Sequence, residues 1–374
     1  MLVGVPKEIK IHEYRVGLTP SSVREIIRAG SQVMIEQNAG LGIGIDDDGY
    51  TEAGAIIVSN ADDIFASADL IVKVKEPRPE ECKKLRDQQI LFTYLHLAAD
   101  KNQAKLLMAS GCTAIAYETV TQTDGGLPLL TPMSQVAGRM SIQAGAHFLE
   151  KAQGGSGVLL GGVPGVEPGQ VLIIGGGVVG THAAEMALGL GATVTILDKS
   201  LVRLQQLHMQ FGSRLNTIYA TQESIEKYAI QADVIVGAVL MPGGAAPKLI
   251  TRDTLRMMRP GSVVVDVAID QGGCIETSRP TTHQHPTFVE EGITHYCVSN
   301  MPGAVPRTST FALNNATLPF IMSLVTKGAH RALLDDKHLF NGLNIYQGQI
   351  TCEPVAQALC ETYVPAKIVG KVFA

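Results

Sequence analysis

Basic and titratable side chains follow several of the strands predicted in the first third of the chain. Arg15 lies after the first predicted strand, Lys75 ends the third and His96 follows the fourth. Singly, each has a simpler explanation: a surface ion pair for Arg15, a solvated strand end for Lys75 and a helix cap for His96. Because ligands bind at the carboxyl ends of the strands in an open α/β sheet, the three together indicate a pocket for an anionic substrate.

A glycine-rich turn in the middle of the chain has the spacing of a dinucleotide-binding fingerprint. The buried-strand run Val171–Ile174 is followed by Gly175-Gly176-Gly177-Val178-Val179-Gly180 and then by a predicted helix. We expect Gly175 to permit the tight turn, Gly177 to let a pyrophosphate approach the backbone, and Gly180 to let the helix pack on the strand. The helix N-terminus offers free amides to the phosphates. The strand-to-helix context is what makes this short motif specific.

An acidic residue follows at the end of the next predicted strand. Asp198 lies 18 residues beyond Gly180, close to where a carboxylate contacts the ribose hydroxyls of a dinucleotide. A negative charge there would repel a 2′-phosphate, which predicts NAD rather than NADP as the cofactor. Arg203 works against this preference, because a nearby arginine can accept that phosphate.

The chain resembles the alanine dehydrogenases, which are grouped with the NAD-binding part of proton-translocating transhydrogenases and with lysine-pathway dehydrogenases. The resemblance runs nearly end to end. The matching segments, besides the glycine turn, are Val5–Glu8, Arg15–Pro20, Val74–Pro77, Tyr94–Ala98, Ala116–Val120, Gly161–Val166, Asp266–Gly273 and Ser299–Ser309.

The resemblance implies L-alanine dehydrogenase activity, the reversible NAD-dependent oxidative deamination of L-alanine to pyruvate and ammonium. It also implies that Arg15 and Lys75 bind the substrate carboxylate and that His96 and Asp270 transfer protons. The cofactor-binding residues would be Ser134, Gly175, Gly177, Val178, Val179, Gly180, Asp198, Arg203, Asn300 and Met301.

These roles agree with the chemistry of the side chains. Arg15 presents a fork that matches a carboxylate, and Lys75 adds a compact second charge. The imidazole of His96 can both accept and donate a proton, which suits a group that moves protons during a deamination. The family is hexameric, so the resemblance implies a homohexamer.

Two other functions stay open on the sequence. The chain could be the NAD-binding subunit of a proton-translocating transhydrogenase, although Lys75, His96 and Asp270 are all present. It could also be a dehydrogenase for a longer amino acid. Tyr94 and Met133 are candidates for residues that restrict the pocket to a small side chain.

Alternating apolar and helical segments predict an α/β fold of two doubly wound, Rossmann-like domains. We predict a substrate domain from residues 1–130 and 306–374, which is therefore discontinuous, and an NAD-binding domain from residues 131–305. Ser134–Ala152 is predicted to be a helix, and the glycine-rich stretch 154–169 a turn or hairpin. After residue 307 the chain is predicted to be helical, without a sheet of its own.

Composition excludes several other classes of protein. A net charge of −5 argues against nucleic-acid binding, and six cysteines without a Cys-x-x-Cys pair indicate free thiols in a reducing compartment. No apolar run approaches the ~18 residues that span a bilayer, and no signal peptide is recognised, so a cytoplasmic protein is expected. His283-Gln284-His285 lacks a further ligand at suitable spacing, so no metal site is predicted.

Overall fold

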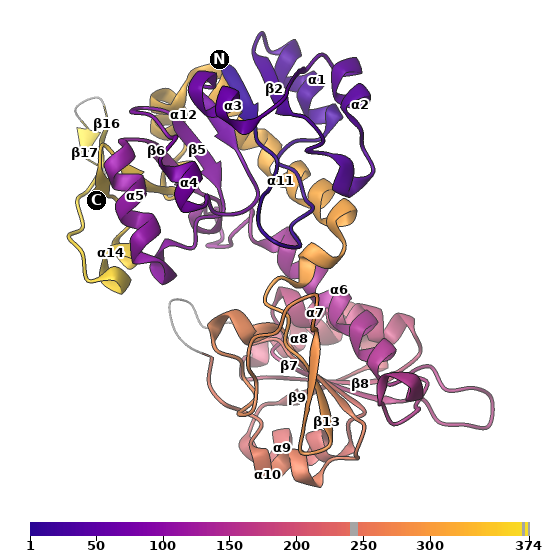
Figure 1. Cartoon of the computed structure of the whole chain (residues 1–374). Coiled ribbons are helices and arrows are strands. Elements are labelled where there is room, and N and C mark those ends of the chain that lie inside the picture. The colour runs from indigo at the N-terminus through magenta and orange to yellow at the C-terminus, as the bar shows by residue number, and fades with distance from the viewer. Residues whose placement is uncertain (240–245, 369–370, 373–374) are drawn as a thin grey trace. The chain divides into compact units, whose positions relative to one another are not determined.

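The computed structural model describes residues 1–239, 246–368 and 371–372, and it divides the chain into two compact units. Unit 1 comprises Met1–Met133 and Val305–Ala374, and unit 2 comprises Ser134–Ala304. Figure 1 shows that the orange-to-yellow end of the chain packs among the elements of its indigo-to-purple beginning. The first unit is therefore discontinuous in sequence.

Unit 1 is built on an eight-stranded sheet in the order β15-β14-β6-β5-β4-β1-β2-β3. Strands β1 to β6 are parallel, and every residue of β4, β5 and β6 is buried, as expected for strands covered on both faces. The strands are β1 (Leu2–Val5), β2 (Gln32–Glu36), β3 (Ile56–Val58), β4 (Leu70–Val72), β5 (Ile90–Thr93), β6 (Thr113–Ala116), β14 (Leu343–Tyr346) and β15 (Gln349–Ile350).

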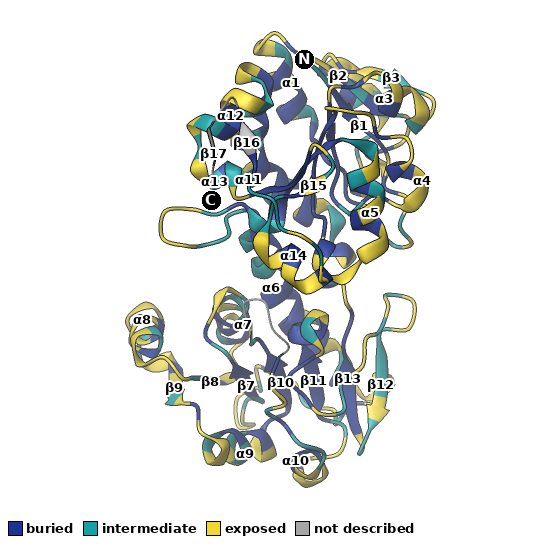
Figure 2. Cartoon of the chain, turned by 90° about the vertical axis from the view of Figure 1, so that its left-hand side faces the viewer, coloured by how far each residue is buried: buried dark blue, intermediate teal, exposed yellow. Residues whose placement is uncertain are grey.

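Amphipathic helices cover this sheet and turn their polar faces outward, as the yellow outer surfaces in Figure 2 show. They are α1 (Pro20–Arg28), α2 (Asp47–Glu52), α3 (Ala61–Ser67), α4 (Pro79–Cys82), α5 (Lys101–Ser110), α11 (Pro306–Lys327), α12 (Ala329–Asp335), α13 (Lys337–Phe340) and α14 (Glu353–Leu359). Short 3-10 turns are η1 (Leu41–Ile43), η2 (Leu97–Ala99) and η3 (Tyr117–Thr119). Phe65, Leu107 and Leu359 show how α3, α5 and α14 share one apolar cluster with the sheet.

The C-terminal segment departs from its prediction. It was expected to be helical, but β14 pairs antiparallel with β6, and β15 pairs antiparallel with β14, so the tail extends the first sheet. A further two-stranded ribbon joins β16 (Lys367–Ile368) to β17 (Lys371–Val372). Short strands such as Leu343–Tyr346 carry too few residues for a periodic signal, and here the neighbouring strand decides the conformation.

Unit 2 has a seven-stranded sheet in the order β12-β13-β11-β10-β7-β8-β9. Its strands are β7 (Gln170–Ile174), β8 (Thr193–Asp198), β9 (Leu215–Tyr219), β10 (Val234–Gly237), β11 (Val263–Asp266), β12 (Thr287–Glu290) and β13 (Ile293–Tyr296). All neighbours are parallel except β12, an edge strand that the sequence analysis missed. Six of the strands reproduce the doubly wound order of a dinucleotide-binding domain.

Strand geometry separates the helices of unit 2 into two layers. Side chains alternate across a strand, so Val171 and Ile173 pack with one helix layer, and Leu172 and Ile174 pack with the other. The first layer holds α6 (Thr131–Phe148) and α7 (Val178–Gly189), and the second holds α9 (Gln222–Gln231) and α10 (Arg252–Met257). The remaining elements are α8 (Leu201–Phe211), η4 (Lys151–Gln153), η5 (Gly212–Arg214), η6 (Val267–Gln271) and η7 (Met301–Ala304).

Most predicted elements occur with shifted ends. Helix α6 begins at Thr131, earlier than the predicted Ser134, because Pro132 fits the first turn of a helix. Residues 154–169 form no helix, and the bridge between Val163 and Val166 makes a tight hairpin there. No helix of the described residues is long and apolar enough to cross a membrane. All six cysteines are described, and each is a free thiol.

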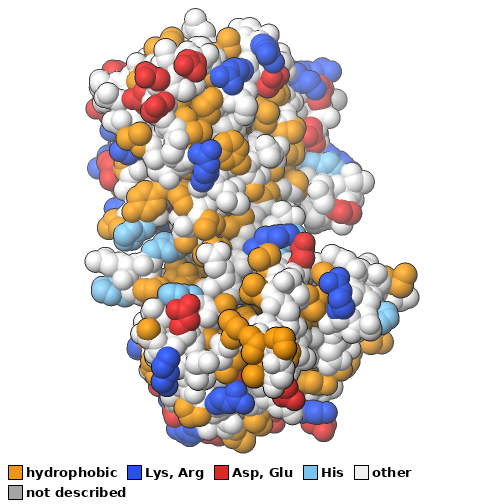
Figure 3. Space-filling model, turned by 90° about the vertical axis from the view of Figure 1, so that its right-hand side faces the viewer, with side chains coloured by type: hydrophobic (Ala, Val, Ile, Leu, Met, Phe, Trp, Pro, Cys, Tyr) orange, Lys and Arg blue, Asp and Glu red, His pale blue; other side chains and the backbone are white. Residues whose placement is uncertain are grey.

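Charged side chains are mixed on the surface. On the face shown in Figure 3, the Lys and Arg side chains of the described residues are interspersed with Asp and Glu, and they do not gather into one basic patch.

Candidate active site

The first sheet changes winding direction between β1 and β4. From β1 the chain builds outward through β2 and β3, and then returns to place β4 on the other side of β1. The carboxyl ends of β1, β4, β5 and β6 lie at the same edge of the sheet, since these strands are parallel neighbours. This edge is where open α/β sheets bind ligands. Arg15, Lys75 and His96 all follow strands that end there.

Arg15 is buried and paired, so it is not the surface ion pair considered above. Only 2% of it is exposed, and its Nε and Nη2 donate to the two carboxylate oxygens of Glu13 at 2.7 and 2.6 Å. Nη1 lies 3.1 Å from the sulfur of Met133. Burial alone would raise the pKa of Glu13, but the hydrogen bonds and charge of Arg15 lower it to about 2.

The segment that carries Arg15 is held by helix α11, from the C-terminal part of the chain. The Asn314 side chain accepts the amide of Thr19 at 3.1 Å and donates to the carbonyl of Gly17 at 2.9 Å. It also accepts the hydroxyls of Thr19 and Ser22. A side chain at Gly17 would collide with the carbonyl of Val72, so this segment packs directly against the end of β4. Asn314 is 2% exposed, so its polar partners are isolated from water.

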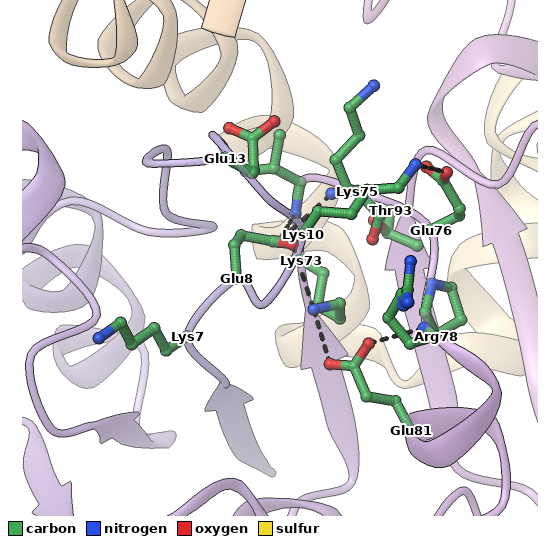
Figure 4. A network of polar contacts seen from close by, with 12 residues as sticks. Lys7, Glu8, Lys10, Glu13, Lys73, Lys75, Glu76, Arg78, Glu81 and Thr93 are labelled. Carbon is green, nitrogen blue, oxygen red and sulfur yellow. Dashed lines mark hydrogen bonds and ion pairs between the residues drawn. The ribbon is translucent and has the colours of Figure 1, made fainter. Parts of the chain in front are cut away.

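The alternating lysines after β4 have different environments. Lys73 is fully buried, and its ammonium lies 2.9 Å from Glu81 and 3.3 Å from Glu8 (Figure 4). These two carboxylates satisfy the buried charge, so Lys73 has a structural role. Within the described part of the chain, the ammonium of Lys75 makes no hydrogen bond or ion pair. Burial, and secondly the charge of Arg15, lower the pKa of Lys75.

A hollow of about 320 Å³ adjoins Arg15 on the side of β1 and β2. Lys7, Lys10 and His12 contribute to its wall, together with Glu8 and Glu13. Lys10 forms an ion pair with Glu76, as Figure 4 shows. The wall of this hollow therefore combines basic side chains with two glutamates, and Lys75 is not among its lining residues.

His96 lies in the loop after β5, where its backbone adopts an uncommon conformation. Its φ and ψ are 50° and 35°, the left-handed region that non-glycine residues rarely adopt. The imidazole is exposed and stacks on Tyr94, with ring centroids 5.8 Å apart and planes 11° apart. The Tyr94 hydroxyl donates to the carbonyl of Leu129 at 2.5 Å. His96 precedes η2 but makes no side-chain cap bond to it.

Steric contacts explain why the glycine turn of unit 2 has glycine at each end. Gly175 has a φ of 105°, and a side chain there would lie 2.5 Å from the carbonyl oxygen of Ala238. A side chain at Gly180 would lie 1.9 Å from the carbonyl oxygen of Gly175, so only glycine lets α7 approach β7. At Gly177 an added Cβ would meet no described atom within 4 Å, so the backbone is open to an approaching group. Val178 and Val179 form the first turn of α7.

Asp198 and Arg203 brace this turn. The carboxylate of Asp198 accepts the amides of Gly176 at 2.7 Å and Ser200 at 2.8 Å. The guanidinium of Arg203 donates to the Gly176 carbonyl at 2.6 Å and to the Thr181 hydroxyl at 2.6 Å. Its remaining nitrogen donates to Gln206 at 2.9 Å. Arg203 is thus committed to the turn.

The other predicted residues of unit 2 follow neighbouring strands. Asp270 is exposed in η6, after β11, while Asn300 and Met301 follow β13, the strand beside β11. The Asn300 carbonyl accepts the Gly303 amide at 2.8 Å and contacts His283 Nε2 at 2.9 Å. Met301 is 3% exposed. Ser134 lies in the first part of α6 and is half-buried.

Several polar residues that shape these loops were not singled out from the sequence. Glu8 and Glu118 each accept backbone amides beside a predicted site residue, and Asp266, fully buried at the end of β11, accepts the Ser278 hydroxyl at 2.6 Å. Glu13 and Asn314 hold Arg15 and its segment. Glu8 and Glu118 lie within family motifs and Glu13 lies just before one, but their hydrogen-bond partners depend on the fold. Among the described residues, no cluster of three or more His, Cys, Asp or Glu could hold a metal ion.

Two doubly wound units, with basic residues at one switch point and a dinucleotide turn at the other, define the class of two-domain Rossmann-fold oxidoreductases. Models of the "Alanine dehydrogenase/PNT" N-terminal and C-terminal domains match residues 4–137 and 141–353. The chain belongs to the alanine dehydrogenase/PNT family, as the resemblance predicted.

Individual relatives cover nearly the whole chain. An alanine dehydrogenase of Halomonas elongata is 57% identical over 98% of this chain and 99% of its own length. An alanine dehydrogenase of Bacillus subtilis is 52% identical over 98% of this chain and 97% of its own length. A solved L-alanine dehydrogenase superposes with a TM-score of 0.94 at 53% identity, covering 96% of this chain and 99% of its own. A transhydrogenase of Sinorhizobium meliloti, 23% identical, shares the fold with a TM-score of 0.81 over 94% and 99% of the two chains.

Proposed function

We propose that this chain is an L-alanine dehydrogenase, which reversibly converts L-alanine, NAD and water to pyruvate, ammonium, NADH and a proton. The observation that carries the proposal is the pair of cationic side chains, Arg15 and Lys75, at the switch point of unit 1. It is supported by the 57% identity to the Halomonas elongata alanine dehydrogenase over almost the full length. We assign substrate binding to residues 1–130 with 306–374, and cofactor binding to residues 131–305.

Arg15 and Lys75 would both bind the substrate carboxylate, and each would make a different contribution. Glu13 already occupies the Nε and Nη2 atoms of Arg15 and compensates much of its charge. The ammonium of Lys75 makes no hydrogen bond or ion pair in the described structure, so its N–H donors are available to an anionic ligand. Arg15 contributes orientation through its rigid, buried guanidinium.

The glycine turn of unit 2 fits a dinucleotide. Gly177 leaves open space where a pyrophosphate would approach, and the first amides of α7 carry no side-chain cap. The Asp198 oxygens accept backbone amides and retain lone pairs for the ribose hydroxyls. Because Arg203 is committed to Gly176 and Thr181, it is poorly placed to offset the repulsion of a 2′-phosphate, which favours NAD. We assign further cofactor contacts to Ser134, Val178, Val179, Asn300 and Met301.

The α-ammonium group of alanine first releases a proton, and removal of the hydride from Cα then leaves an iminium on the substrate. When bound, NAD supplies the acceptor for that hydride. Water then adds to the iminium carbon, the C–N bond breaks, and pyruvate and ammonium form. We assign His96 the proton taken from the water and returned to the leaving amine. Asp270 would assist the proton transfer.

Residues beside Arg15 support a small amino acid over a longer one. Met133 contacts the guanidinium, and Tyr94 is fastened at its hydroxyl to Leu129 and packs edge-on against Tyr117 at 5.1 Å. A fixed aromatic ring and a thioether beside the carboxylate anchor leave little freedom for a long side chain. The resemblance further leads us to propose a cytoplasmic homohexamer, which size-exclusion chromatography with light scattering would test.

The function is tested by following NADH absorbance when the purified chain is mixed with NAD and one amino acid at a time. L-Alanine should give much faster NADH formation than lysine, leucine or glutamate. Pyruvate with ammonium and NADH should run in reverse. Absence of NADH formation from L-alanine would overturn the proposal.

A further inference from the structure

Two loops of unit 1 contain the same arrangement of hydrogen bonds at the ends of neighbouring strands. In each, one glutamate carboxylate accepts the backbone amides of two successive residues, and the second of these is a predicted site residue. Glu118 accepts the amides of Leu95 and His96, after β5. Glu8 accepts the amides of Val74 and Lys75, after β4. Successive amides that converge on one anion fix the local backbone strongly, since charge-assisted hydrogen bonds are the strongest of their kind.

Glu118 reaches His96 from the neighbouring strand. It lies in η3, directly after β6, and β5 and β6 are parallel and in register. Its Oε1 accepts the His96 amide at 2.5 Å, and its two oxygens lie 3.2 and 3.1 Å from the Leu95 amide. The contact therefore depends on the sheet, since β5 and β6 are separated in sequence by helix α5.

The conformation of His96 needs such support. A left-handed backbone is unfavourable for a non-glycine residue, and it persists only where the surroundings enforce it. In the described structure, the imidazole of His96 makes no hydrogen bond that could orient it. The ring direction follows from the backbone conformation and from stacking on Tyr94. The carboxylate thus acts on the backbone of His96, and the ring keeps both nitrogens for a reacting group.

Glu8 holds Lys75 in the same way. Its Oε1 lies 2.7 Å from the Val74 amide and 3.3 Å from the Lys75 amide, and its Oε2 contacts the buried Lys73. Figure 4 shows Glu8 near Lys73. The chain after β4 is thereby fixed where the Lys75 side chain departs.

We propose that Glu118 is a positioning residue for His96 and that Glu8 is a positioning residue for Lys75. This rests on the proposed function, which gives His96 the proton transfer and Lys75 the substrate carboxylate. The two glutamates should then affect different kinetic constants. Loss of Glu118 lowers kcat, because the base is misplaced, whereas loss of the Glu8 contact raises KM for alanine.

The test compares Glu118→Ala with a matched control, Asp100→Ala, in steady-state assays with alanine and NAD. Asp100 is also a carboxylate that accepts two amides, those of Asn102 at 3.0 Å and Gln103 at 2.9 Å, in the same loop. A misplacement of about 1 Å can cost roughly 100-fold, so Glu118→Ala should lower kcat about 10- to 100-fold, with KM for NAD unchanged. Asp100→Ala should lower the melting temperature but leave kcat unchanged.

Two further variants separate positioning from general stability. Glu118→Gln keeps an acceptor oxygen for both amides and should retain most of kcat. If Glu118→Ala folds poorly, Glu118→Gln still tests the proposal. In a His96→Ala background, Glu118→Ala should cause little further loss of kcat, because the group it positions is gone. A full additional loss in that background, or an unchanged kcat in Glu118→Ala, would overturn the assignment.

The second part of the test compares two variants of Glu8. Glu8→Gln keeps an acceptor oxygen for the amides of Val74 and Lys75, and Glu8→Ala removes it. Glu8→Ala should raise KM for alanine more than Glu8→Gln does and should change kcat less than Glu118→Ala does. Equal effects of the two Glu8 variants on KM would exclude backbone positioning by Glu8. They would indicate that Glu8 acts through its negative charge, which neutralises the buried ammonium of Lys73. If the unmodified chain failed to oxidise alanine, the proposed function would fail; if it were active and these variants behaved like the control, only the positioning proposal would fail.

Discussion

The buried Glu13–Arg15 pair allows a quantitative prediction for Glu13→Gln. The pKa of Glu13 is lowered from 4.5 to about 2, and one pKa unit corresponds to about 1.4 kcal/mol. The ionised carboxylate therefore contributes roughly 3 kcal/mol to the free energy of unfolding. Glutamine keeps the shape of the side chain but leaves the Arg15 charge uncompensated in a site that is 2% exposed. Breaking a buried pair in this way typically costs about 3–5 kcal/mol, in agreement with the pKa.

The sign of the pH dependence follows from the direction of the shift. Glu13 has a depressed pKa in the folded state, so its stabilisation is complete above its ordinary pKa of 4.5. It is lost as the pH falls through the folded value of about 2. The difference in unfolding free energy between the parent and Glu13→Gln should therefore be constant between about pH 6 and 8 and should narrow in acid.

The assay is urea unfolding followed by far-ultraviolet circular dichroism, because the chain contains no tryptophan. Glu25→Gln is the matched control, since it removes a glutamate from an exposed pair with Arg28 at 2.8 Å. An exposed pair contributes less than about 1 kcal/mol, so this control should be nearly neutral. A loss in Glu13→Gln no greater than in the control, or a difference that grows on acidification, would refute the reasoning.

Three other predictions concern activity. Lys75→Ala should weaken kcat/KM for alanine by about 2–5 kcal/mol of transition-state binding while NAD binding persists; a near-normal kcat/KM would remove Lys75 from the site. Asp198→Asn should narrow the preference for NAD over NADP while keeping an acceptor for the Gly176 amide, and equal use of both cofactors by the parent would contradict the assignment. Asn314→Leu should cost about 1–3 kcal/mol of stability for each buried partner left unpaired and should raise KM for alanine, as thermal unfolding and kinetics would show.

Predictions from the sequence succeed where the cause is local. Strand β7, the glycine turn and α7 follow one another directly, and the steric need for glycine at Gly175 and Gly180 arises within that short span. The same holds for the doubly wound class of both units, since alternating apolar runs and amphipathic helices determine it. Positions after predicted strands led to Arg15, Lys75 and His96, and the parallel sheet places all three after strands that end at one edge.

The ends of these strands were less well predicted. β4 ends at Val72 and β5 at Thr93, so Lys75 and Tyr94 belong to the loops. The apolar pattern continues past these ends, because burial continues into the loops and so do single backbone hydrogen bonds, such as that from the Tyr94 amide to the Val74 carbonyl at 3.3 Å. The sequence cannot distinguish a buried loop residue from a buried strand residue on apolar character alone.

The tertiary structure decided which polar groups hold the site. Asn314 meets Gly17 and Thr19 from almost the other end of the chain, and Glu118 meets His96 across two neighbouring strands. The buried role of Lys73, as opposed to that of Lys75, depends on Glu8 and Glu81 in the same way. Local sequence determines the glycine turn and the longer strands and helices, because these depend on neighbouring residues. Which buried donor meets which acceptor depends on packing between segments that are distant in sequence, and only the folded chain settles it.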